Sequence, residues 1–200
     1  MRILLIFIIL TTSCMSHSDK NTDRTPAENQ LNSQSMREVF YSFRESGKGK
    51  WRVQDDVVMG GRSDSQLQMT PEGYAQFSGR VSLENNGGFC SIHQTTEKDP
   101  YAISDTSTVF LVRLNGDGKE YNFRVRTPNG RHSYAFTFPT KGDGHWETIA
   151  IPFNKMKATY RGETVDIPSY NGESILEMQL LIGNKKEETF ELLIEAIGID

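Results

Sequence analysis

The residues best suited to chemistry lie in one short stretch, DDVVMGGRSDS, at positions 55 to 65. Asp55 and Asp56 carry the carboxylates that a general acid and base require, and Arg62 offers a guanidinium to an acidic ligand. Adjacent residues of a strand point to opposite faces, which argues against joint catalysis by the two acids. The stretch is therefore either a ligand-binding loop or a tight corner, and the pattern favours the corner.

In the corner interpretation, residues 57–59 lead a strand into the core and the glycines at 60 and 61 allow a turn that other residues resist. Asp55 or Asp56, together with Ser63, would then hydrogen-bond the amides of the turn. This leaves Arg62 as the outward-facing contact.

The other reactive side chains form no catalytic or metal-binding motif. The four histidines are scattered, and Cys90 and His93 lie three apart in an expected strand, on opposite faces. Cys90 is thus expected to be a small core residue. The stretch NGDGKEY at 115–121 lacks the ligand pattern of a calcium loop and is interpreted as a hairpin turn. We expect no metal site, no cofactor and no enzyme activity.

A second candidate binding site consists of polar side chains in two expected strands. Arg113, Asn122, Arg124 and Arg126 are expected on strand faces opposite the apolar set, where neighbouring strands could gather them into one patch. Such a patch could bind an acidic partner or a polar ligand. The alternative is pairing with Glu side chains on a solvated face. The formal net charge of −4 disfavours polyanions, including nucleic acid.

The N-terminus carries an export signal. Arg2 precedes the apolar run at 3–10 and the small residues TTSC, so residues 1–13 are expected to be a lipoprotein-type signal peptide and Cys14 the lipidated residue. Residues 14–36 are polar and are expected to form a flexible tether to a domain at 37–200. These features predict a lipid-anchored protein of the cell envelope, on the periplasmic side or at the cell surface.

From residue 37 onward the pattern is that of an all-β protein. Apolar residues alternate in YNFRVR (121–126) and YAFTF (134–138), and Gly-containing turns recur at short intervals. This spacing favours an antiparallel β-sandwich. Residues 175–183 and 190–199 are expected to form a C-terminal hairpin, and only 152–162 suggests a helix.

Several segments together resemble one family. WRVQDDVVMGGRSDS (51–65), FSGRVSLENNGGFCSI (77–92) and GDGKEYNFRVR (116–126) match, in order and spacing, the complex I intermediate-associated protein 30 family, over about residues 38 to 199. The resemblance implies a galactose-binding-like jelly-roll β-sandwich. It also implies a non-enzymatic assembly chaperone that binds membrane subunits of respiratory NADH:ubiquinone oxidoreductase.

Two functions therefore stay open. The first is a protein-binding module that contacts an envelope or membrane protein. The second is a carbohydrate-binding module, in which Trp51, Tyr101 or Trp146 would stack on sugar rings, although such aromatics are more often core anchors.

Overall fold

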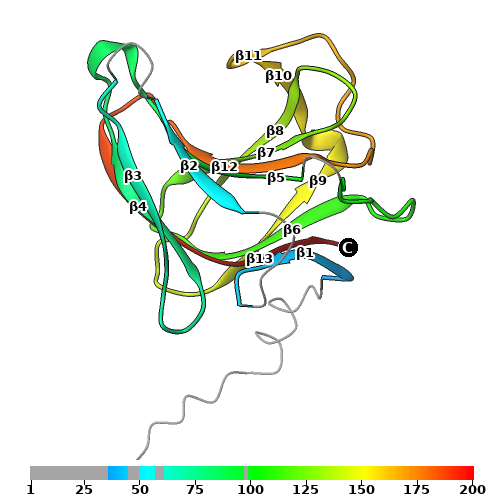
Figure 1. Cartoon of the computed structure of the whole chain (residues 1–200), viewed down its shortest axis with the longest axis horizontal. Coiled ribbons are helices and arrows are strands. Elements are labelled where there is room, and N and C mark those ends of the chain that lie inside the picture. Colours follow the sequence, from blue (N-terminus) through cyan, green and yellow to red (C-terminus); the bar gives the residue numbers. More distant parts are fainter. Residues whose placement is uncertain (1–35, 45–49, 57–60, 97–98) are drawn as a thin grey trace, which may run out of the picture.

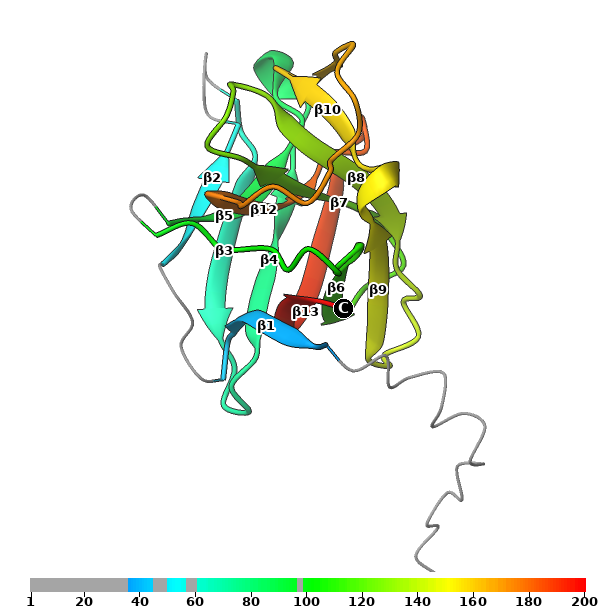
Figure 2. The same ribbon diagram turned by 90° about the vertical axis from the view of Figure 1, so that its right-hand side faces the viewer.

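The computed structural model describes residues 36–44, 50–56, 61–96 and 99–200. Two antiparallel sheets stack face to face, as Figure 1 shows. Across the six-stranded sheet the order is β3 (Asp64–Met69), β4 (Ala75–Val81), β13 (Glu188–Ile199), β6 (Val109–Asn115) and β9 (Glu147–Pro152), and β1 (Glu38–Ser42) also pairs with β13. These strands run side by side in Figure 2. The prediction of an all-β, antiparallel sandwich is confirmed.

The second sheet has seven strands and carries the candidate site. Its order is β11 (Glu163–Thr164), β10 (Lys157–Tyr160), β8 (Ser133–Pro139), β7 (Glu120–Arg126), β12 (Glu177–Ile182), β5 (Cys90–Thr95) and β2 (Trp51–Asp55). In the described part of the chain, no further layer of secondary structure covers the outer side of this sheet. At its two ends, β10 with β11 and the turn η2 (Glu84–Asn86) rise beside that outer side (Figure 1).

The core lies between the two sheets and is rich in aromatic rings. Phe110 of β6 packs against Phe123 of β7, with ring centroids 5.4 Å apart, and against Phe153 and Tyr170. Alternation places these rings inside, since Tyr121, Phe123 and Val125 are buried while the intervening residues of β7 are partly exposed. The domain is therefore held together by apolar burial, and Cys90, the one cysteine described, is a free buried thiol.

Two predictions about local structure are wrong. The expected helix at 152–162 is a short 3-10 turn, Phe153–Lys155, followed by β10, in which Ala158 is buried and its neighbours on either side face outward or partly outward. The expected C-terminal hairpin does not form, because β12 and β13 belong to different sheets and residues 183–187 cross between them. The NGDG stretch likewise connects β6 to β7 in the other sheet and is not a hairpin turn.

None of the helical turns in the described ranges has the length and apolarity needed to cross a membrane. The expected signal peptide, Cys14 and nearly all of the tether lie outside the described residues.

Candidate functional site: an outward-facing polar sheet surface

The stretch at 55–65 is a structural corner. Asp55, at the end of β2, accepts hydrogen bonds from the amide of Ser65 (2.8 Å) and from its hydroxyl (2.6 Å), which joins β2 to the start of β3. Ser63 instead exchanges hydrogen bonds with the backbone of Ser82. The corner interpretation is confirmed for Asp55, while residues 57–60, expected to hold the strand end and part of the turn, lie outside the described residues.

The other two candidate residues of this stretch are Asp56 and Arg62. The backbone amide of Asp56 bonds the carbonyl of Phe89, so it continues the pairing of β2 with β5. Arg62 is exposed and lies 3.3 Å from Glu84 in an ion pair at the surface. Exposed pairs of this kind contribute little to stability. Arg62 lies just before β3 of the six-stranded sheet and is not part of the seven-stranded sheet.

Arg113 does not join the other predicted residues. It lies on β6 in the six-stranded sheet, whereas Asn122, Arg124 and Arg126 lie on β7 in the other. Arg113 faces Glu195 at 3.7 Å, where the pairing of β13 with β6 shifts register, and its guanidinium lies 6.0 Å from the ring of Trp146. The expectation of one patch formed by all four residues is therefore wrong.

The three remaining residues lie on a polar surface built from six adjacent strands. We call this surface the polar platform and define it by the outward-facing side chains of β2, β5, β12, β7, β8 and β10. The register places one row across it, with Arg52 opposite His93, His93 opposite Gln179, Gln179 opposite Arg124, Arg124 opposite Ala135, and Ala135 opposite Lys157. Sequence reasoning found Arg124 but missed its neighbours, because they come from distant strands.

A hydrogen-bonded network holds one side of the platform. Glu177 of β12 accepts from Arg126 (3.2 Å) and from the hydroxyl of Thr95 (3.1 Å), and its other oxygen lies 3.9 Å from Nδ1 of His93. These side chains are all partly buried. Glu177 is thus occupied by its partners and is poorly placed to act as a general base.

Hydrogen bonds also fix the orientation of the side-chain amides of the platform. Asn122 donates to the hydroxyl of Thr137 (2.8 Å), and Gln179 donates to the hydroxyl of Ser91 (3.1 Å). Ser91 in turn donates to the backbone carbonyl of Gln54 (2.7 Å). Donors and acceptors fixed on strands form a rigid hydrogen-bonding surface.

Arg124 differs from Arg126, the next outward-facing residue of β7, because no described acidic side chain pairs with it. Its Nε donates to Oδ1 of Asn122 at 2.6 Å, and no described carboxylate lies within ion-pair distance of it, since Glu177 pairs with Arg126 instead. Partial burial lowers the pKa of the Arg124 guanidinium below its usual value. A desolvated charge without a counter-charge is costly, and an anionic ligand would remove that cost.

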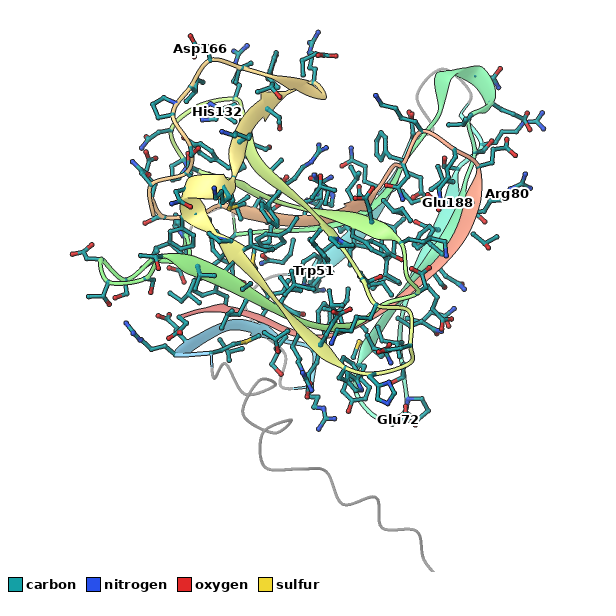
Figure 3. The ribbon with its side chains drawn as sticks, turned by 180° about the vertical axis from the view of Figure 1, so that it is seen from behind. Trp51, Glu72, Arg80, His132, Asp166 and Glu188 are labelled. Atoms are coloured by element: carbon teal, nitrogen blue, oxygen red, sulfur yellow. The ribbon has the colours of Figure 1, made fainter. Side chains whose placement is uncertain are left out.

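The aromatic residues considered for sugar stacking are not on this surface. Tyr101 is buried, and Trp51 packs between the sheets with its ring centroid 5.5 Å from that of Phe43 (Figure 3). Trp146 is partly exposed but stacks on Tyr74 at 4.4 Å beside the six-stranded sheet. In the described ranges the exposed aromatic side chain of the platform strands is Tyr160, the last residue of β10, which alternation places on the same side of the strand as buried Ala158. Those ranges also contain no group of three side chains that could hold a metal ion.

Comparison with known proteins identifies the family. The complex I intermediate-associated protein 30 family model matches residues 41–194. Complex I intermediate-associated protein 30 of mouse mitochondria is 27% identical over 185 residues, which is 80% of this chain but 55% of that protein. The chain thus spans about half the length of this relative. An uncharacterised protein of Schizosaccharomyces pombe is 24% identical over 166 residues, 74% of this chain and 76% of that one.

The fold is shared with solved carbohydrate-binding domains. The family 11 carbohydrate-binding module of a Clostridium thermocellum cellulase superposes with a TM-score of 0.57 at 13% identity, covering 80% of this chain and 92% of that one. This likeness confirms the galactose-binding-like sandwich and says nothing by itself of the ligand. The family model, which matches residues 41–194, shows that the chain belongs to the complex I intermediate-associated protein 30 family.

Proposed function

We propose that this protein is a non-enzymatic binding module that holds its ligand on the polar platform. The observation that carries the proposal is Arg124, a partly buried guanidinium at the middle of an uncovered sheet face, with one hydrogen bond and no described acidic partner. Glu177, the acid on the adjacent strand β12, is engaged because it pairs with Arg126. This arrangement suits recognition better than proton transfer.

The first ligand class is a protein, in an assembly-factor-like role. Membership of the complex I intermediate-associated protein 30 family supports this class, as does the name of the mouse relative. In our proposal the module is exported and lipid-anchored at Cys14, so that its partner is an envelope or membrane protein.

The second ligand class is a glycan. The side-chain amides and hydroxyls of Asn122, Gln179 and Thr137 favour it, because fixed polar groups of this kind can pair with sugar hydroxyls. A protein interface, in contrast, usually has an apolar or aromatic centre, and the platform has none in the described ranges.

Photo-crosslinking in cells, combined with a glycan array, tests the proposal. A crosslinker replaces the exposed Thr137 on the platform, or Arg80 on β4 of the other sheet as the control. Figure 3 shows Arg80 at the outer edge of the molecule, pointing away from the core. A protein captured from position 137 but not from position 80 would support the first class. Array binding that Arg124→Gln weakens would support the second, and a blank array with no specific crosslink would overturn the proposal.

The anchor has its own test. Cys14→Ala should abolish acyl labelling and release the protein from membranes, whereas Cys90→Ala should not, because Cys90 is buried in the domain. Membrane retention of the Cys14→Ala variant would contradict lipidation as the cause of anchoring.

A further inference from the structure

We propose that the polar platform binds a linear acidic polysaccharide, with sugar carboxylates paired to the cationic side chains of the row that runs from Arg52 through Arg124 to Lys157. This inference rests on the proposed binding function and adds the chemical class of the ligand.

The cations of the platform are spaced along one line. Arg52, Arg124 and Lys157 lie in one register row on β2, β7 and β10, with His93 and Gln179 between the first two. Neighbouring strands are about 4.8 Å apart, so the row extends over roughly 24 Å of backbone from β2 to β10. Charges in a line of this length match a polymer better than one small anion.

The platform has more basic than acidic side chains. The charged outward-facing side chains of the platform strands are Arg52, Arg124, Arg126 and Lys157 on the basic side and Glu120 and Glu177 on the acidic side. The row itself contains no acid. The chain as a whole carries a formal charge of −4, so the platform is locally basic on an acidic protein. A local field of this kind attracts an anionic ligand to the platform specifically.

The guanidinium of Arg124 is arranged to bind a carboxylate. Only its Nε is occupied, by Oδ1 of Asn122, so the other N–H groups of the guanidinium have no partner in the described ranges. These groups form the planar fork that binds a carboxylate through two hydrogen bonds. Asn122 is itself held by Thr137, which fixes the orientation of the fork. A carboxylate would both satisfy these donors and compensate the partly buried charge.

Neutral glycans and acidic proteins fit the platform less well. A neutral glycan is disfavoured, because in the described ranges no aromatic side chain for stacking on a sugar ring lies in the row, and the exposed Tyr160 ends β10 on the side opposite to Lys157. An acidic protein is disfavoured because, in the described ranges, the outward-facing apolar side chains beside the row are those of Ala135 and Leu181, too few to form the dry centre of an interface. A hydroxyl-rich polymer that carries carboxylates fits both observations.

The experiment measures binding of the full chain, purified in detergent, by isothermal titration calorimetry. The probes are polygalacturonate, the same polymer after methyl esterification of its carboxylates, mixed-linkage β-glucan and polyglutamate. The inference predicts binding to polygalacturonate, and at least about tenfold weaker binding to the other three, since a lost charged hydrogen-bond pair weakens binding by that order.

Variants locate the site. Arg124→Gln should weaken binding to polygalacturonate by about tenfold or more, and Arg80→Gln, which removes the same charge from the other sheet, should leave it within about twofold. Arg52→Gln and Lys157→Gln change exposed ends of the row, and each should weaken binding to a smaller degree. These two variants keep the inference testable if the Arg124 variant does not fold.

The outcomes separate this inference from the proposed function. If the esterified polymer or the β-glucan binds as well as polygalacturonate and Arg124→Gln reduces that binding, the platform is the site but the acidic class is wrong. Equal binding of polyglutamate would identify an acidic peptide as the ligand and would overturn the inference. If Arg80→Gln reduces binding as much as Arg124→Gln does, the polymer is attracted to positive charge in general, and the inference is overturned. The absence of binding to polygalacturonate would also overturn the inference.

Discussion

Asp117 is expected to link the two sheets, and its replacement provides a quantitative test of the fold. It lies in the crossing from β6 to β7 and accepts four hydrogen bonds, from the amide (3.3 Å) and Nζ (2.7 Å) of Lys119, the hydroxyl of Tyr121 (3.1 Å) and the amide of Glu191 in β13 (2.9 Å). One carboxylate thus connects its own loop to a strand of each sheet. The side chain is 18% exposed, so solvent replaces these bonds poorly.

The magnitude follows from the partners that Asp117→Asn loses. Asparagine keeps one acceptor oxygen but presents an NH₂ group to donors, so at least one charged hydrogen bond becomes a donor facing a donor. Loss of a charged hydrogen bond costs about 1.5–3 kcal/mol. We expect the free energy of unfolding at pH 7 to fall by about 2 kcal/mol, which lowers Tm by about 4–8 °C for a domain of this size.

The pH dependence has a definite sign. Burial alone would raise the pKa of Asp117, but the hydrogen bonds from Lys119, Glu191 and Tyr121 outweigh burial and hold this pKa below its usual value of 3.8. A carboxyl whose pKa is lower in the folded state stabilises the fold above its unfolded pKa, and loses that contribution as pH falls through the folded pKa. The stability difference between the native protein and Asp117→Asn should therefore be full at pH 7 and shrink below about pH 4.

Urea denaturation across pH 3 to 7 measures this difference, with Asp143→Asn as the control. Asp143 also lies between two glycines, but its side chain is 49% exposed and it accepts from the amide of His145 at the turn. Its replacement should change stability much less. Equal losses for the two variants, or a loss at Asp117 that does not change with pH, would refute the assignment of Asp117 as a charged link between the sheets.

Three further predictions concern the corner, the thiol and one turn. Asp55→Asn should lower the free energy of unfolding by about 1–2 kcal/mol in urea, since it disrupts the two bonds to Ser65, and an unchanged midpoint would contradict the corner. Burial, with the charge of Asp55, raises the pKa of Cys90 to about 12, so peptide mapping should find Cys90 unalkylated by iodoacetamide at pH 8 until denaturant is added. Gly142→Ala should destabilise more than Gly144→Ala, because both have positive φ but only the former would place Cβ 2.6 Å from a backbone nitrogen; equal Tm values would contradict this.

The sequence predicted the strands well where burial alternates along one element. In β7 the alternation placed Asn122, Arg124 and Arg126 on one face, and the structure has them there. The prediction from sequence failed where tertiary contacts determine the secondary structure. In residues 152–162 the turn at Phe153–Lys155 has helical character, but burial of Met156 and Ala158 selects an extended chain. The extended conformation is favourable because the segment pairs with the edge of the sheet, and the local sequence pattern contains no information about that edge.

The C-terminal hairpin was wrong for a different reason. Strands β12 and β13 have the composition of two paired strands, joined by a polar connector, yet each pairs with other strands in its own sheet. A period of two reports which side of a strand is buried, and in a sandwich both sheets bury the same kind of side. The sequence therefore distinguishes inside from outside but does not distinguish a hairpin from a crossing between sheets.

The same limit explains why the candidate site was only half predicted. Arg113 and Arg124 have similar sequence surroundings, each between apolar residues in a strand. Register gives Arg113 the carboxylate of Glu195 and the ring of Trp146 as neighbours, and gives Arg124 the uncharged Gln179 and Ala135. One arginine is thereby neutralised within the fold while the other keeps an uncompensated charge on an open face. Net charge averages over both arginines and is the reason to expect no polyanion partner for the whole chain, whereas strand pairing sets the local charge of each sheet face.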